Sequence, residues 1–343
     1  MAHKKNNNIF KSLVDVLGFL LLSLIVVVKS IVTYILPEAY QYYKELKGEV
    51  ILITGGGGGL GRLLALRLAR LNAIVVLWDV NIKAVEETVE MVKGIGGKAY
   101  GFKCDLANKD DVYKIANVTR QEVGEVTILI NNAGVVSGNL LLDTPDHLIK
   151  RTFDVNILAH FWTVKAFLPY MIEKNRGHIV TIASMAGFVG INKLVDYCSS
   201  KYAAVGFDEA LRVELEAQGI DGVKTTVICP YFIQSTGMFD NVNSRFLPTL
   251  KSNDVADRIV NAVRKEEVVV MMPKIFRAAL ICKFMFPWAC VSMFLRGLVP
   301  DAAPPHQSHV QNSEKSDFNT KSNLIKNSVV SLDNRDGISG KNL

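Results

Sequence analysis

Short runs of β-branched and aliphatic residues recur through the middle of the chain, and amphipathic stretches of helical length separate most of them. Near-continuous apolar strands that alternate with helices are typical of a parallel sheet covered on both faces. The pattern therefore predicts one α/β domain over residues 48–273, built on a single doubly wound parallel sheet. The predicted strands are Val50–Ile53, Ile74–Leu77, Ile128–Ile130, Ile179–Ile182, Thr225–Ile228 and Val268–Met271.

An apolar segment precedes this domain. Its densest part, Val16–Val28, has 13 uncharged residues. As a helix it reaches about 20 Å, whereas a bilayer core is about 30 Å thick. We interpret residues 1–47 as a membrane anchor and linker, either one span that includes Lys29 or a shallow or re-entrant helix in one leaflet. The alternatives are a buried core helix and a signal peptide, and the lack of small A-x-A residues after the apolar core disfavours the latter.

Two segments of different composition follow the domain. Residues 274–300 are apolar and aromatic, carry spaced cations and contain Pro287, a helix breaker. This composition favours an element at a membrane surface over a pair of core helices. Residues 301–343 are rich in Asn, Ser, Lys and Asp with few large apolar side chains, which predicts a disordered tail.

Composition excludes several classes of protein. Apolar residues make up 49% of the 343 residues, so the chain as a whole is not disordered. The net charge is +6, from 39 basic and 33 acidic residues, with no run of five basic residues, so no nucleic-acid partner is expected. Five cysteines without a CxxC pair favour a reducing compartment, and six histidines without ligand spacing predict no metal site.

A glycine-rich segment follows the first predicted strand and precedes a helical pattern. Six of the nine residues 54–62 are glycine, and Gly55, Gly59 and Gly61 have the spacing Gly-x3-Gly-x-Gly. Such a turn lets the backbone approach a pyrophosphate at a helix N-terminus. Asp79 lies 18 residues later at the end of the second predicted strand, where a carboxylate accepts hydrogen bonds from ribose hydroxyls. Because Asp79 would repel a 2′-phosphate and Val80 supplies no cation, we expect NAD rather than NADP.

A phenol and an ammonium group lie one helical turn apart, at Tyr197 and Lys201. A cation beside a tyrosine lowers its pKa, so that the phenol can exchange a proton with an alcohol during hydride transfer. Ser184 lies 13 residues upstream of Tyr197, at the end of a predicted strand, and its hydroxyl can orient the same substrate oxygen. Together the three side chains predict alcohol–carbonyl redox chemistry.

These motifs, with the segment Asn131–Gly134, resemble those of the short-chain dehydrogenase/reductase family. The resemblance covers about residues 48–273, or two-thirds of the chain, and implies a Rossmann-type fold. It implies that Tyr197 is the catalytic acid/base and that Lys201 lowers the tyrosine pKa and holds the nicotinamide ribose. It assigns substrate orientation to Ser184, and support of a proton-relay water to Asn156.

The resemblance also implies a set of cofactor contacts. An acid in the segment Cys104–Leu106 contacts the adenine amine, and an asparagine lies near the adenosine. Members usually carry Pro-Gly after the sixth strand and then a threonine that bonds the nicotinamide carboxamide. Here Tyr231 replaces the glycine, and the hydroxyl that bonds the carboxamide can come from either Ser235 or Thr236. The expected cofactor-binding residues are Gly55, Gly59, Leu60, Gly61, Asp79, Asp105, Leu106, Asn132, Tyr197, Lys201, Ser235 and Thr236.

Within the family, the anchor and residues 54–62, 76–81, 153–162 and 229–239 resemble a membrane-associated branch of epidermal-type retinol dehydrogenases and 17β-hydroxysteroid dehydrogenases. This implies NAD-dependent oxidation of a lipophilic alcohol, all-trans-retinol first and a steroid as the alternative. It implies a homodimer on the endoplasmic reticulum membrane or lipid droplets, with the catalytic domain facing the cytosol. A non-catalytic membrane scaffold and an NADPH carbonyl reductase remain as other classes; the intact Ser184, Tyr197 and Lys201 and the acidic Asp79, respectively, disfavour them.

Overall fold

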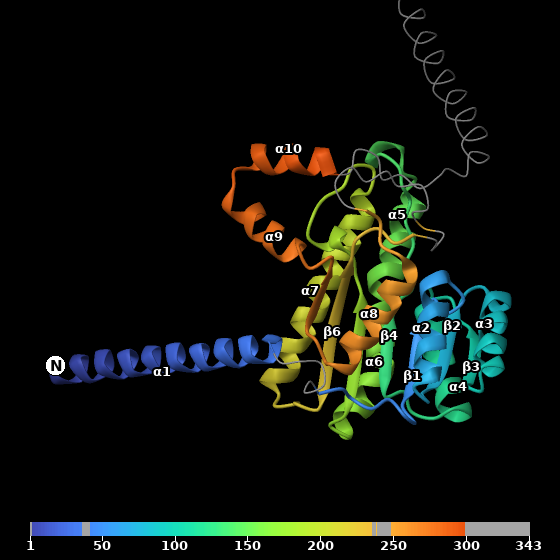
Figure 1. Cartoon of the computed structure of the whole chain (residues 1–343), viewed down its shortest axis with the longest axis horizontal. Coiled ribbons are helices and arrows are strands. Elements are labelled where there is room, and N and C mark those ends of the chain that lie inside the picture. Colours follow the sequence, from blue (N-terminus) through green and yellow to red (C-terminus); the bar gives the residue numbers. More distant parts are fainter. Residues whose placement is uncertain (1, 36–41, 235–237, 239–247, 299–343) are drawn as a thin grey trace, which may run out of the picture.

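The computed structural model describes residues 2–35, 42–234, 238 and 248–298. Within these residues, seven parallel strands form one sheet in the order β3-β2-β1-β4-β5-β6-β7 (Figure 1). The strands are β1 (Val50–Thr54), β2 (Ile74–Asp79), β3 (Lys98–Lys103), β4 (Ile128–Asn131), β5 (Gly177–Ile182), β6 (Val223–Pro230) and β7 (Val269–Met272). The α-helices are α1 (Ala2–Ile35), α2 (Gly59–Arg70), α3 (Ile82–Gly94), α4 (Lys109–Glu122), α5 (Asp146–Phe153), α6 (Ala159–Glu173), α7 (Val195–Ala217), α8 (Ser252–Arg264), α9 (Phe276–Met285) and α10 (Trp288–Leu298).

Helices cover both faces of the sheet. Buried side chains of α2, α3 and α8 pack with the strands in one apolar cluster. Those of α4, α6 and α7 form a second cluster on the other face, where the Trp78 and Phe167 ring centroids lie 5.7 Å apart. All five residues of β1 are buried, as expected for a central parallel strand. The structure therefore confirms the doubly wound α/β fold with a single parallel sheet.

The strand order reverses between β1 and β4. In the sheet, the two neighbours of β1 are β2 and β4. In parallel sheets of this kind, ligands bind beyond the carboxyl ends of the strands where the order reverses. The predicted site residues Gly55, Asp79, Asn132 and Ser184 all lie at or just beyond those ends.

One strand was not predicted. The edge strand β3 pairs only with β2, and Ala99 is its only buried residue. An edge strand with so little burial lacks the continuous apolar run by which the other strands were identified. A side chain is excluded at Gly101, because a Cβ there would lie 2.3 Å from Val85 of α3.

The N-terminal apolar segment forms α1. Its window Lys11–Lys29 has a mean hydropathy of 2.3 and is long and apolar enough to cross a membrane. None of this window is buried in the protein, so α1 does not serve as a core helix of the α/β domain.

The apolar segment after β7 folds as two short helices, α9 and α10, which lie above the upper end of α7 in Figure 1. Pro287 lies between them, as a helix breaker should. Phe276 and Leu280 of α9 are buried against the domain, while most of the other large side chains that the structure describes on the pair are exposed. The tail predicted to be disordered, 301–343, lies outside the described residues.

Candidate active site

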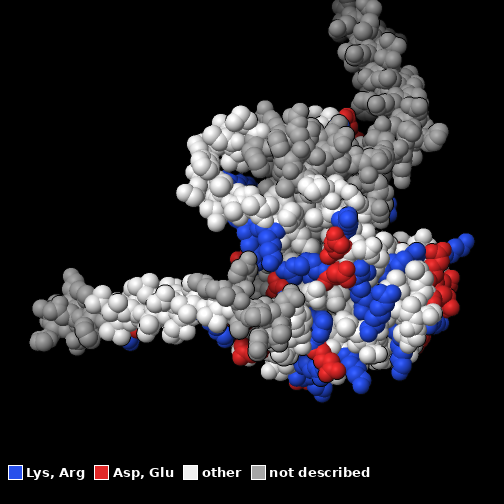
Figure 2. All heavy atoms as spheres, viewed as in Figure 1, with Lys and Arg blue, Asp and Glu red and all other residues white. Residues whose placement is uncertain are grey.

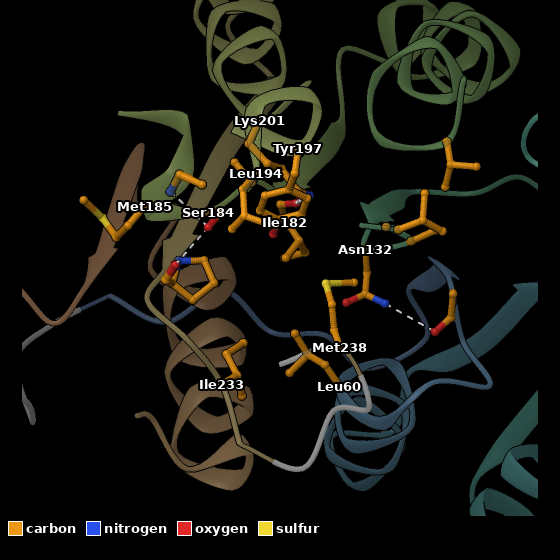
Figure 3. A pocket seen from close by; sticks show the side chains of 18 of the residues that line it. Leu60, Asn132, Ile182, Ser184, Met185, Leu194, Tyr197, Lys201, Ile233 and Met238 are labelled. Carbon is orange, nitrogen blue, oxygen red and sulfur yellow. Dashed lines mark hydrogen bonds between the residues drawn. The ribbon is translucent and has the colours of Figure 1, made fainter. Parts of the chain in front are cut away.

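A cavity of about 1130 Å³ lies beyond the carboxyl ends of the strands. Its wall runs from the glycine-rich turn after β1, past the ends of β2, β4, β5 and β6, to α9 and α10. Figure 3 shows Ser184, Tyr197 and Lys201 together on one side and Asn132 and Leu60 on another. One end of the cavity is therefore backbone-rich, and the other carries the predicted proton-transfer residues.

The glycine-rich turn is too close to its neighbours for side chains. A Cβ on Gly61 would lie 2.2 Å from the Gly55 carbonyl oxygen, and one on Gly55 would lie 2.9 Å from the Cα of Ala133. Gly55 also has a φ of 66°, which glycine adopts without strain. Gly59 begins α2 without a side-chain cap, so the first N–H groups of the helix are available to an anion. This cradle fits a pyrophosphate.

Asp79 ends β2 at the edge of this cradle. Its Oδ2 accepts a hydrogen bond from the Gly57 N–H at 3.1 Å, and its Oδ1 accepts one from the Asn81 N–H at 3.0 Å. Arg62, the nearest cation in sequence to the glycines, pairs with Glu87 at 2.9 Å. The Asp79 carboxylate is thus fixed by two backbone groups and lines the cavity.

Asn132 braces the turn after β1. Its Nδ2 donates to the Thr54 carbonyl at 2.9 Å, and its backbone N–H donates to the Thr54 hydroxyl at 3.0 Å. Asp105 and Leu106, beyond the end of β3, also line the cavity. The structure therefore brings all the described cofactor-contact candidates to one cavity. The other two, Ser235 and Thr236, lie outside the described residues.

Ser184 and Tyr197 meet at the other end of the cavity. Ser184 follows β5, and its hydroxyl accepts the Ala186 N–H at 3.1 Å, donates to the Pro230 carbonyl at 3.4 Å and forms a hydrogen bond with Tyr197. The Lys201 Nζ lies 5.7 Å from the centre of the Tyr197 ring and donates to the Ile182 carbonyl at 2.9 Å. The predicted cluster of hydroxyl, phenol and ammonium groups is present.

The electrostatics of this cluster differ from the sequence-based expectation. Burial raises the pKa of Tyr197 well above its ordinary value, and the hydrogen bond with Ser184 only partly opposes this effect. Burial also lowers the pKa of Lys201 to about 8. Burial, the largest influence on the pKa of Tyr197, thus acts against the lowered tyrosine pKa that the neighbouring ammonium leads us to expect.

Asn156 lies in a π-helical turn, Asp154–Leu158, between α5 and α6. Its Oδ1 accepts the Val135 N–H at 2.8 Å, while its Nδ2 donates to the Val135 carbonyl at 2.9 Å and to the Ser200 hydroxyl at 3.0 Å. A single-turn π-helix is often found at functional sites. The side chain of Asn156 therefore links the segment after β4 to Ser200 of α7, the residue directly before Lys201.

Asp196, directly before Tyr197, was not identified from the sequence. It is buried and accepts hydrogen bonds from the Ser137 hydroxyl at 2.9 Å and the Thr152 hydroxyl at 2.8 Å. These contacts fix the first turn of α7, and with it Tyr197, to the segment after β4 and to α5. The only signal in the sequence is an acid beside the tyrosine, which is too common to identify such a role.

Tyr231, which replaces the usual glycine after β6, is buried. Its ring centroid lies 4.9 Å from that of Phe232 and 5.4 Å from that of Phe276 in α9. The substitution therefore supplies an aromatic contact between the end of β6 and α9.

Comparisons with known proteins identify the family. Residues 49–246 match the family model for short chain dehydrogenases. The chain is 49% identical to short-chain dehydrogenase/reductase family 16C member 6 of Bos taurus, over 70% of this chain and 77% of the relative. The chain belongs to the short-chain dehydrogenase family. This short-chain dehydrogenase is also 43% identical to epidermal retinol dehydrogenase 2 of Mus musculus, over 81% of this chain and 90% of that protein. It is 45% identical to estradiol 17-beta-dehydrogenase 11 of Macaca fascicularis, over 77% and 86% respectively.

Two solved structures share the fold of this short-chain dehydrogenase. A short chain dehydrogenase/reductase from Burkholderia phymatum in complex with NAD has a TM-score of 0.63 and 27% identity, covering 69% of this chain and 92% of that one. A metagenomic short-chain oxidoreductase in complex with NADP has a TM-score of 0.57 and 25% identity, covering 66% and 96%. The protein is thus an oxidoreductase that acts on CH–OH groups of small-molecule alcohols with a nicotinamide cofactor.

The side chains of this short-chain dehydrogenase fit such a cofactor. The glycine cradle would hold the pyrophosphate, Asp79 the adenosine ribose, and Lys201 the ribose on the nicotinamide side. When bound, the nicotinamide accepts or gives the hydride. The predicted proton-transfer residues Ser184 and Tyr197 line the same cavity.

Proposed function

We propose that this dehydrogenase oxidises a lipophilic alcohol with NAD, and that its substrate is all-trans-retinol, which it converts to retinaldehyde. The observation that carries the proposal is the position of the Ser184–Tyr197 pair, at the end of the cavity opposite the backbone-rich cradle and beside an apolar pocket. The side chains that make this pocket apolar include Met185, Val189, Ile191, Leu194, Phe232 and Trp288.

Each residue of the cluster has one task in the proposed reaction. The Ser184 hydroxyl binds the substrate oxygen, and the Tyr197 phenolate oxygen takes the hydroxyl proton as the hydride leaves the carbon. The Lys201 ammonium stabilises the phenolate and so offsets part of the desolvation that raises the pKa of Tyr197. Asn156 is a positioning residue, because it holds the segment after β4 against α7. In the reverse direction, Tyr197 returns the proton to the carbonyl oxygen.

The preference for NAD rests on charge. The Asp79 carboxylate faces the cavity and repels a 2′-phosphate. Arg151 and Lys201 are the cations among the described residues that line the cavity, and neither belongs to the segment that follows β2. An NADP-preferring site needs a cation where this chain has Val80.

The proposal extends to the place of the reaction. We infer that α1 anchors the protein in the endoplasmic reticulum membrane or on lipid droplets, and that the catalytic domain faces the cytosol. The length and hydropathy of Lys11–Lys29 support the anchor, and the five free cysteines agree with a reducing compartment. We also infer a homodimer, on the basis of the family resemblance alone.

A steroid is the second candidate, supported by the 45% identity to estradiol 17-beta-dehydrogenase 11. To decide, membranes that contain the full chain are supplied with all-trans-retinol or estradiol, each with NAD or NADP. We expect the highest kcat/KM with retinol and NAD. Higher kcat/KM with estradiol would replace the substrate, and NADP preference would contradict the role of Asp79. No turnover of either alcohol, with NAD still bound, would support a non-catalytic scaffold.

A further inference from the structure

The helices α9 and α10 present a surface of large apolar side chains to solvent. Phe284 is 80% exposed, and Met285, on the same helix, is 76% exposed. In Figure 2 the described part of this lobe is mostly white, with blue side chains at its lower edge, whereas blue and red side chains are scattered over the body below it. We call it the α9–α10 surface. Its described exposed members are Ile281, Phe284, Met285, Phe286, Trp288 and Met293.

Isolated exposed apolar residues are ordinary, but a contiguous apolar surface marks a binding site. The charge of residues 274–298 indicates which kind of partner fits this surface. Residues 274–298 contain four cations and no acidic residue, which gives a net charge of +4; two of the cations, Arg277 and Lys283, also bond to the body of the protein. Apolar and aromatic side chains flanked by cations match the acyl chains and anionic headgroups of a phospholipid bilayer. The same chain carries α1, long enough to span such a bilayer, so the surface is held close to it.

The α9–α10 surface is continuous with the cavity. Phe276, Trp288 and Ser292 line the cavity wall, and Trp288 is at the same time 68% exposed. The rim of the cavity is therefore made by the helices that carry the apolar surface. An alcohol dissolved in a bilayer would reach the cavity through this rim without crossing water.

Lys283 connects the surface to the catalytic segments. Its Nζ donates to the Phe188 carbonyl and, at 2.9 Å, to the Tyr202 hydroxyl. Phe188 lies four residues after Ser184, and Tyr202 directly follows Lys201. The ammonium group of Lys283 thus points toward the body of the protein and fixes α9 beside the elements that carry the proton-transfer residues.

We propose that the α9–α10 surface docks on a phospholipid bilayer and that the lipophilic alcohol enters the cavity from the acyl-chain region at the rim formed by Trp288 and Ser292. The docking depends only on the surface, whereas the entry route rests on the proposed function. The two parts are therefore tested by different measurements.

Docking is tested by fluorescence of the full chain in anionic vesicles whose lipids carry bromine near the headgroup end of the acyl chains. Trp288 is exposed, whereas Trp78 is fully buried, so the difference between wild type and Trp288→Phe isolates the Trp288 signal. We expect brominated lipid to quench this difference signal by more than about half, because the indole lies at the interface. Equal difference signals in brominated and unbrominated vesicles would overturn the docking.

The entry route is tested with Met285→Glu, which places a charge on the surface without touching the cavity lining, and with Met91→Glu on α3 as the matched control. With all-trans-retinol in vesicles, we expect Met285→Glu to raise KM on the order of 5-fold at unchanged kcat, and Met91→Glu to leave KM unchanged. With retinol on a water-soluble cyclodextrin carrier, both variants should match wild type. An unchanged KM in vesicles, or an equal rise with the carrier, would overturn the route. No retinol turnover by wild type would overturn the proposed function and the route with it, and leave the docking to the fluorescence result.

Discussion

Removal of the Lys201 ammonium tests how the protein offsets the burial of Tyr197. The Nζ lies 5.7 Å from the centre of the tyrosine ring, and both side chains are buried. At this separation and an effective dielectric constant of about 20, a unit positive charge stabilises a phenolate by about 3 kcal/mol. Loss of the charge in Lys201→Met should therefore lower the phenolate population, and with it kcat below pH 8, by about 100-fold.

The pH profile distinguishes this effect from simple damage. In Lys201→Met the acidic limb of the kcat profile, where activity rises with pH as the phenol loses its proton, should move about two pH units upward, so that a higher pH restores part of the activity. Lys201→Arg keeps the charge and should retain the wild-type limb. A 100-fold loss that does not depend on pH would refute the electrostatic role and leave only a binding role.

Stability provides a second control on the same variant. Burial lowers the pKa of Lys201 to about 8, so a charged lysine at pH 7 destabilises the native state. This penalty is fully present below pH 8 and is relieved as pH rises toward the unfolded value of 10.5. Lys201→Met should therefore unfold at or above the wild-type temperature at pH 7. A clearly lower unfolding temperature would mean that its loss of activity reports misfolding.

Three further predictions concern other parts of the structure. Asp79→Ala combined with Val80→Arg should shift the NADP/NAD ratio of kcat/KM by about 100-fold toward NADP, and an unchanged ratio would contradict the role of the carboxylate. Burial lowers the pKa of His160 and His178 to about 3, so the unfolded chain takes up protons below pH 6.5 that the native state does not. The unfolding temperature should thus fall as the pH is lowered from 6.5. The two histidines together should reduce the free energy of unfolding by at most about 2.7 kcal/mol per pH unit, and this reduction should be smaller in His178→Gln. Asp196→Ala removes the acceptor of one buried and one partly buried hydrogen bond and should cost about 3 kcal/mol in urea unfolding, where a loss below about 1 kcal/mol would argue against the bracing role.

The sequence predicts the fold well where burial is continuous. The strands β1, β2, β4, β5 and β6 are buried on both faces, so their residues form apolar runs that need no knowledge of the neighbours. The edge strand β3 has a single buried residue, and its pairing with β2 is a long-range property that no local pattern contains. The same limit applies to the π-helical turn at Asn156, which depends on the contacts of its side chain with Val135 and Ser200.

The candidate site, too, is predictable from the sequence only in part. Helical spacing places Tyr197 and Lys201 on one face, and strand ends bring Ser184 to the same edge of the sheet, so their meeting is predictable. The direction of the Tyr197 pKa is not predictable in this way, because its largest cause is burial by side chains from distant segments. The role of Asp196 is hidden for the same reason, since its partners Ser137 and Thr152 lie far away in sequence.

Proton transfer by Tyr197 is the central claim, and one comparison tests it most directly. Membranes with wild type, Tyr197→Phe or the control Tyr100→Phe on β3 are supplied with all-trans-retinol and NAD, and retinaldehyde is measured together with NAD affinity. We predict that Tyr197→Phe forms retinaldehyde at least about 100-fold more slowly with little change in NAD affinity, while Tyr100→Phe matches wild type. Full activity of Tyr197→Phe would contradict the assignment of the acid/base, and with it the mechanism built on this cavity.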